Sequence, residues 1–239
     1  DPYSLSSVDQ LQCINDDQLG GPGPRDSYQL ESDIDATGTP VWNDGSGFEP
    51  IGSFTGSFDG AGYEIDGLTI DRGDSQNVGL FGSADAPIKD VTLTDADISG
   101  DENTGVLAGD YAGTVEEVTI IESDVSGGSS TGGLVGSHDG TIKSSSVEGS
   151  SVSGSGTTGG LVGKDTADST IVSSYTAVDD VSVNSGSGGG LVGAHEGSIT
   201  QSYASGSINP NTGNIGGLVG KSSGSINKSF ASIEISDVN

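Results

Sequence analysis

The chain has no methionine, one cysteine, one tryptophan and only seven lysine and arginine residues among its 239 positions. A single cysteine, Cys13, cannot form an intramolecular disulfide, so the cysteine count does not indicate a redox compartment. Scarce basic residues disfavour nucleic acid and anionic membrane surfaces as partners, because phosphate contacts need lysine and arginine. No apolar run approaches the ~20 residues of a membrane-spanning helix, so we expect no membrane insertion.

Acidic residues are abundant, and 35 of them give a net charge of −28. This composition, rich also in serine, threonine and glycine, is typical of a halophile's surface, where salt screens the self-repulsion. An acidic protein from an ordinary organism is the alternative. Residues 1–124 carry 26 acidic and 3 basic residues, whereas residues 125–239 carry 9 and 4. We therefore interpret the second half as a neutral serine- and glycine-rich surface, better suited to packing against another copy or a neutral partner.

One short motif recurs along most of the chain. The sequence GGLVG stands at 132–136, 159–163, 189–193 and 216–220, with the variants VGLFG at 78–82 and GVLAG at 105–109. Successive leucines of these copies are 27, 27, 27, 30 and 27 residues apart. A fixed period in this range indicates stacked repeats, and periodic apolar residues argue against disorder.

Each repeat contains apolar segments that are too short for helices and rich in β-branched residues. We predict an all-β, single-domain β-solenoid of about seven coils, each of ~27 residues with three short strands. Glycines are expected at the corners, where positive φ or close backbone approach is needed. The three extra residues between Leu161 and Leu191 are expected to bulge near 184–188.

Residues 1–50 are predicted to be an N-terminal cap, and residues 51–239 the solenoid. Ser7 and Gln10 match a capping box within a short helix over 4–19, in which Cys13 would be a small buried side chain. A loop is expected over 20–27, a strand over 28–34 and a second loop over 35–47. The first coil follows, with five apolar side chains pointing inward: Phe54, Phe58, Ile65, Leu68 and Ile70.

The repeats resemble those of GLUG-motif proteins, named for glycine, leucine, any residue and glycine. Gly79–Gly82 and the four GGLVG copies carry this resemblance, together with the preceding run over 33–70, so it covers nearly the whole chain. GVLAG at 105–109 departs from the pattern by a valine. The resemblance implies a module of a large secreted or cell-surface protein, often adhesin-like. It implies no enzyme activity and names no catalytic residues.

Two groups of polar residues have a spacing that is similar to that of ligand sites. A calcium-like loop has the offsets of Asp33, Asp35, Thr37, Gly38, Thr39 and Asp44, but a turn stabilised by an Asp side chain is the favoured interpretation. His138 and His195 both follow a coil leucine by four residues, with Asp165 between them. Two coil steps, about 10 Å, are too far for one metal, and we predict a solvated corner column. No catalytic, cofactor-binding or metal residues are therefore predicted.

The sequon Asn227–Ser229 is the only N-glycosylation motif in the chain, and the richness in serine and threonine leaves O-glycosylation open.

The sequence predicts an extracellular structural or adhesive surface protein, a homo-oligomer that assembles head-to-tail through its solenoid ends into a filament or surface layer. The terminal segment 225–238 shows no evident cap. The chain begins at Asp1 without methionine, which is consistent with a processed or excised form. A carbohydrate- or cell-binding module of a larger adhesin, contacting cell-surface glycans, is the alternative. A β-helical polysaccharide lyase or hydrolase is disfavoured, because its acidic substrate would meet a negative surface.

Overall fold

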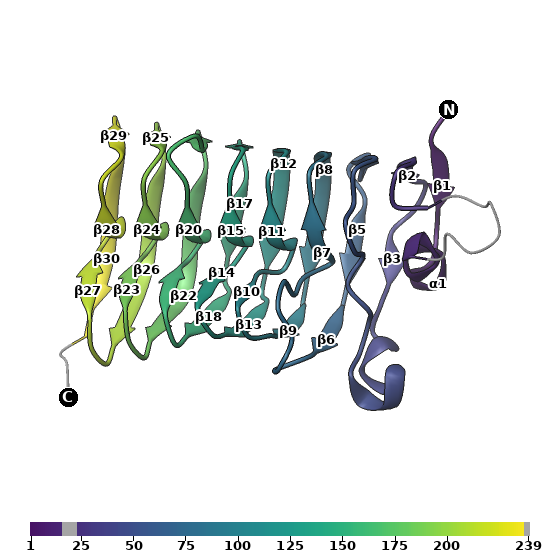
Figure 1. Ribbon diagram of the computed structural model, residues 1–239, viewed down its shortest axis with the longest axis horizontal. Helices are drawn as coiled ribbons and strands as arrows, with labels where there is room; N and C mark the ends of the chain where they lie inside the picture. The colour runs from purple at the N-terminus through teal and green to yellow at the C-terminus, as the bar shows by residue number, and fades with distance from the viewer. Residues whose placement is uncertain (16–22, 237–239) are drawn as a thin grey trace.

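The computed structural model describes residues 1–15 and 23–236, which wind into an all-β solenoid of about eight turns. Figure 1 shows these turns side by side along the long axis, from the N-terminus to the C-terminus. The strands of each turn pair in parallel with their equivalents in the neighbouring turns. The predicted fold class is confirmed.

The strands form three sheets, of which sheet A runs from the N-terminal end to the last turn, whereas sheets B and C begin at Phe81 and Asn103. Sheet A contains β1 (Tyr3–Leu5), β2 (Ser27–Leu30), β3 (Ile34–Asp35), β4 (Ser57–Asp59), β5 (Glu64–Asp66), β6 (Thr69–Asp71), β8 (Pro87–Thr94), β9 (Asp97–Ser99), β12 (Thr114–Ile121), β13 (Asp124–Gly127), β16 (Thr141–Lys143), β17 (Ser146–Glu148), β18 (Ser151–Gly154), β21 (Thr170–Val172), β22 (Tyr175–Val183), β25 (Ser198–Thr200), β26 (Tyr203–Pro210), β29 (Ser225–Asn227) and β30 (Phe230–Ile235). Sheet B contains β7 (Phe81–Ala84), β11 (Ala108–Tyr111), β15 (Val135–His138), β20 (Val162–Asp165), β24 (Val192–His195) and β28 (Val219–Ser222). Sheet C contains β10 (Asn103–Thr104), β14 (Ser130–Gly132), β19 (Thr157–Gly159), β23 (Ser187–Gly189) and β27 (Asn214–Gly216).

The motif leucines form a vertical file inside the solenoid. The amide of Leu134 donates to the carbonyl of Leu161 at 3.0 Å, and the amide of Leu161 donates to that of Leu191 at 2.9 Å. These three side chains are completely buried. The five inward positions predicted for the first coil are also buried. The leucine period therefore reports the turn-to-turn register directly.

The motif glycines serve close packing rather than backbone curvature. A Cβ on Gly136 would lie 2.4 Å from the amide nitrogen of Thr104, and one on Gly163 would lie 2.6 Å from that of Thr131. Sheet B therefore packs directly on sheet C through its glycines. The expectation of glycine at the corners is wrong for one main corner, where Glu117 and Ser144 themselves adopt positive φ of 56° and 50°.

Buried serines hold this corner together. Ser145 accepts a hydrogen bond from the amide of Val118 in the preceding turn at 3.2 Å, and its hydroxyl donates to the carbonyl of Lys143 at 2.9 Å. Later turns repeat both bonds with Ser174, Ser202 and Ser229. We refer to these four residues as the serine ladder. Many serines of the second half are thus buried structural links, which corrects their interpretation as a purely neutral surface.

The N-terminal segment contains the predicted helix in a shorter form. Helix α1 (Val8–Gln12) continues into a 3₁₀ turn, η1 (Cys13–Asn15). Ser7 caps it by accepting from the amide of Gln10 at 3.4 Å. Cys13 is exposed, so its predicted burial is wrong, because the helix turns Leu11 and Ile14 inward instead. The rest of the predicted helix, at 16–19, and the first three residues of the loop at 20–27 lie outside the described residues.

The predicted strand over 28–34 is two strands, β2 and β3, which join sheet A by pairing with β4 and β5. Two 3₁₀ turns, η2 (Thr39–Val41) and η3 (Asn43–Gly45), form the loop that follows. Residues 27–51 thus add an irregular turn to the seven predicted coils. A domain boundary near residue 50 stays a prediction.

The long repeat accommodates its extra residues in two places. Thr141 pairs with Thr170, a step of 29, after His138 pairs with Asp165 at a step of 27. Two residues are therefore inserted in the turn at 166–169. The third lies between Val183 and Gly188, since the step there increases to 30. The prediction of a single bulge near 184–188 is wrong for two of the three residues.

Candidate functional site

The calcium-like loop is folded as a side-chain-stabilised turn. One carboxylate oxygen of Asp35 accepts from the amide of Thr37 at 3.0 Å and from its hydroxyl at 2.6 Å. Asp33 accepts from the amide of Glu64 on the next turn at 3.0 Å. Hydrogen bonding to Thr37 lowers the pKa of Asp35. These bonds fit the turn interpretation. Within 1–15 and 23–236, no group of three or more His, Cys, Asp or Glu side chains is arranged to hold a metal ion.

The two histidines lie in one column, as their spacing predicts, but the column is buried. Tyr111, His138 and Asp165 are register partners at the end of sheet B, and His195 follows Asp165. His138 is fully buried and His195 is 1% exposed. The prediction of a solvated corner is therefore wrong. Each of these side chains points inward, because position four after the coil leucine continues the inward alternation of sheet B.

Asp165 and His195 form a buried pair on two adjacent turns, and His195 also contacts the turn that follows. The Nδ1 atom of His195 lies 2.7 Å from Oδ2 of Asp165, and its Nε2 atom lies 3.3 Å from the carbonyl oxygen of Ser225. Oδ1 of Asp165 accepts from the amide of Glu196 at 2.7 Å. Both ring nitrogens therefore face acceptors, which is the arrangement of an imidazolium ion.

Opposing effects act on the pKa of His195. Burial lowers it, but the hydrogen bond and charge of Asp165, aided by the Ser225 carbonyl, outweigh burial and raise the pKa above its usual value. Because the pair is completely enclosed, it stabilises one register of the last turns rather than offering a proton to a substrate. The spacing of the two histidines in the sequence predicts that they share a column, but it does not predict that the column is buried.

His138 is buried without a hydrogen-bond partner on either ring nitrogen. Burial lowers its pKa to about 4, although the charge of Asp165 and the nearby backbone of Thr170 and Gly140 oppose the shift. Its ring stacks on Tyr111, with centroids 6.3 Å apart and planes 20° from parallel. His138 is therefore a neutral packing residue at physiological pH.

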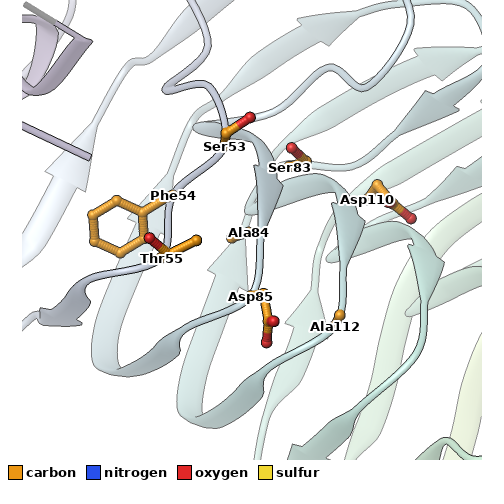
Figure 2. Close-up of a pocket in the computed structure, with 8 residues that line it drawn as sticks. All are labelled: Ser53, Phe54, Thr55, Ser83, Ala84, Asp85, Asp110 and Ala112. Carbon is orange, nitrogen blue, oxygen red and sulfur yellow. The ribbon is translucent and has the colours of Figure 1, made fainter. Parts of the chain in front are cut away.

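A shallow pocket of about 260 Å³ lies where three turns meet. Its lining comes from Ser53, Phe54, Thr55, Ser83, Ala84, Asp85, Asp110 and Ala112. Figure 2 shows Asp85 and Asp110 on separate turns, with their carboxylates apart and not turned toward each other. Acid–base chemistry on a glycosidic bond needs two carboxyl groups that converge on one point. This pocket does not supply that geometry.

The last turn exposes side chains whose equivalents are buried elsewhere. Ile142, Ile171 and Ile199 are completely buried, whereas Ile226, the next residue in their column, is 43% exposed. Through successive register partners, the same column extends to Tyr3 on β1, which is 48% exposed. The two ends of one internal column are therefore both apolar and accessible in this chain.

An aromatic stack follows the outer face of sheet A. The rings of Tyr175 and Tyr203 lie 4.8 Å apart and 3° from parallel, and that of Phe230 lies 5.4 Å from Tyr203 at 9°. Sugars bind aromatic side chains through the ring faces, but here the rings cover one another's faces. Phe230, at the end of the stack, is 63% exposed. The mutual covering of the ring faces disfavours the stack as a glycan platform.

The chain is similar in sequence to one known protein and in structure to another. No family model matches it, so the GLUG resemblance stays a prediction. The chain is 45% identical over 115 residues to halomucin of Haloquadratum walsbyi, a halophilic archaeon; the match covers 46% of this chain and 1% of halomucin. The chain therefore spans only a very small part of that relative.

A structural neighbour shares the fold. The crystal structure of a candidate immunoglobulin A1 protease from Bacteroides ovatus superposes with a TM-score of 0.79 at 18% identity, over 98% of this chain and 77% of that one. Such low identity supports the fold alone and transfers no activity. Among the described helices, none is long and apolar enough to cross a membrane.

Proposed function

We propose that the chain is a structural module of an extracellular surface protein from a halophilic archaeon, acting as a stiff, hydrated spacer rather than as an enzyme. The likeness to halomucin is the observation that carries this proposal. The acidic composition supports it, because 35 carboxylates keep a rod hydrated in brine. The backbone ladder supports stiffness, since every turn is hydrogen-bonded to the next.

The location is tested on whole cells of the source organism. An antibody against the chain should label intact cells, and external protease should remove that label without lysis. Labelling that needs permeabilised cells contradicts an extracellular role. Purified chain should also show no hydrolysis of a panel of polysaccharides and proteins, and specific turnover would contradict the non-enzymatic part of the proposal.

We further propose that modules join head-to-tail, with the last turn of one stacking on the N-terminal end of the next. The exposed Ile226 and Tyr3 belong to the same column, so stacking would continue that column from one copy into another. Charge supports this direction of joining. The last turn carries Lys221 and Lys228 against Glu234, whereas residues 23–35 carry one arginine and four acidic residues.

Assembly is tested by sedimentation over a range of protein concentrations in molar KCl. Ile226→Asp and Tyr3→Asp should each lower the average mass, because either places a charge in the shared column. Val41→Asp is the matched control, since Val41 is 81% exposed but lies in a 3₁₀ turn outside the column. A monomer at all concentrations contradicts assembly, and an effect of Ile226→Asp alone contradicts the head-to-tail direction.

A further inference from the structure

The outward face of sheet A changes character along one register column. Its first members are charged and paired: Lys89 lies 2.9 Å from Asp59, and Lys143 pairs with Glu116. The same column continues through Val172, Thr200 and Asn227. From Val172 onward, this column therefore contains no charged residue and no ion pair within the described residues.

Asn227 is the last residue of β29, and its side chain is exposed on this face. Within the described residues its side-chain amide has no hydrogen-bond partner, while its backbone carbonyl accepts from the amide of Gln201 and the hydroxyl of Ser229. Lys228 turns the corner with a positive φ of 50°. The amide is thus free on the flank of the solenoid rather than enclosed in its core.

The fold explains why a glycosylation motif arises at this position. In every turn of the serine ladder, the residue two positions before the ladder serine occupies the outward column: Lys143 before Ser145, Val172 before Ser174, Thr200 before Ser202 and Asn227 before Ser229. The hydroxyl that an N-glycosylation motif needs is therefore supplied by a structural residue. The only variable part is an asparagine in the outward column, and among these turns only Asn227 provides it.

We propose that Asn227 carries an N-linked glycan. The inference rests on the proposed extracellular location, because the donor, a lipid-linked phosphorylated sugar, is used outside the cytoplasm. The side-chain nitrogen would bond to the anomeric carbon, whose bond to the donor phosphate oxygen breaks. The lipid phosphate leaves with the electron pair, and the amide gives one proton to a base of the transferase. The glycan would hydrate the half of the solenoid that has only 9 of the 35 acidic residues.

The test is peptide mapping of the full chain secreted from a glycosylating haloarchaeal host. We expect a sugar mass on the peptide that contains Asn227. Asn227→Gln should abolish it, and Ser229→Thr should keep it, because threonine supplies the same hydroxyl. Asn214→Gln is the matched control, since Asn214 is exposed but outside the motif. An unmodified Asn227 in a host whose own surface glycoprotein is modified would overturn the proposal.

A second variant tests the role of the column. Thr200→Asn, combined with Asn227→Gln, moves the motif back by one turn, where Ser202 supplies the hydroxyl. The glycan should move to position 200, and its absence there would refute the explanation by the outward column. Incubating full-length chain with host membranes that contain the transferase and donor tests the acceptor without secretion. Modification by membranes without surface labelling of cells would contradict only the proposed location.

Discussion

Replacing His195 with leucine leaves the carboxylate of Asp165 buried without its cation. The two side chains are completely enclosed and 2.7 Å apart. Removing one partner of such a pair costs about 3–5 kcal/mol, mostly because the remaining charge is desolvated. We therefore expect His195→Leu to lower the stability of the last turns by this amount at pH 6, below the unfolded-state pKa of histidine. The double variant Asp165→Leu with His195→Leu should recover most of it, since an apolar pair of similar volume has no charge to desolvate.

The contributions of the two buried histidines to folding stability depend on pH in opposite directions. The folded-state pKa of His195 is raised above the unfolded value, so its contribution to stability is fully present below about pH 6.5 and is lost as the pH rises through the folded value. His138 acts in the opposite direction. Its folded pKa of about 4 means that stability falls between pH 6.5 and 4, and the displacement corresponds to roughly 3 kcal/mol. Stability should therefore have a maximum between these two effects.

The assay is hydrogen exchange at fixed molar KCl, because repeat proteins open turn by turn and one global unfolding energy is not defined. In His195→Leu, amides of β25 and β29 should exchange faster, while those of β8 and β12 stay unchanged. The defect relative to the unmodified chain should persist at pH 5 and should shrink as the pH rises through the folded-state pKa of His195. His138→Phe, which keeps the stack on Tyr111, should remove the loss of stability below pH 6. Unchanged exchange in His195→Leu at pH 6 would refute the ion-pair reasoning.

Four further predictions follow from side chains in other turns. Thr131→Val should raise the opening free energy of the turns around β14 by about 1 kcal/mol in hydrogen exchange, because the Thr131 hydroxyl is buried without a partner; a decrease would mean that a water satisfies it. Ser174→Ala should cost about 1–3 kcal/mol by the same measurement, since the amide of Ser145 loses its acceptor, and Ser174→Thr is the control. Burial and the charges of two neighbouring carboxylates raise the pKa of Asp97, so acidification relieves a destabilising charge. Asp97→Asn should therefore raise the melting temperature at low salt and raise it less in molar KCl, where the neighbouring charges are screened but the cost of burial remains. Calcium should leave the melting temperature unchanged at high salt, because Asp35 already accepts two hydrogen bonds from Thr37; a clear increase would revive the metal site.

Several corrections share one physical origin. The spacing of His138, Asp165 and His195 was visible in the sequence, but polar residues at a turn are usually solvated, and only the stacked turns enclose these three. The interpretation of the corner serines as surface residues is wrong for the same reason. A serine hydroxyl that replaces a missing backbone ladder bond has the same sequence as one that faces water. The predicted burial of Cys13 is wrong because helical periodicity over one short turn does not decide which side of the helix faces inward.

The sequence by itself determined the fold class and the turn-to-turn register, since a 27-residue period of leucine and glycine has one economical solution, a column of parallel turns. It also determined the acidic character, because composition fixes net charge without reference to the fold. Only the tertiary structure decided which polar residues are enclosed, where the extra residues of the long repeat lie, and that the motif glycines bring two sheets together. These depend on contacts between residues about 27 positions apart, and burial is a property of the neighbouring turns rather than of any single repeat.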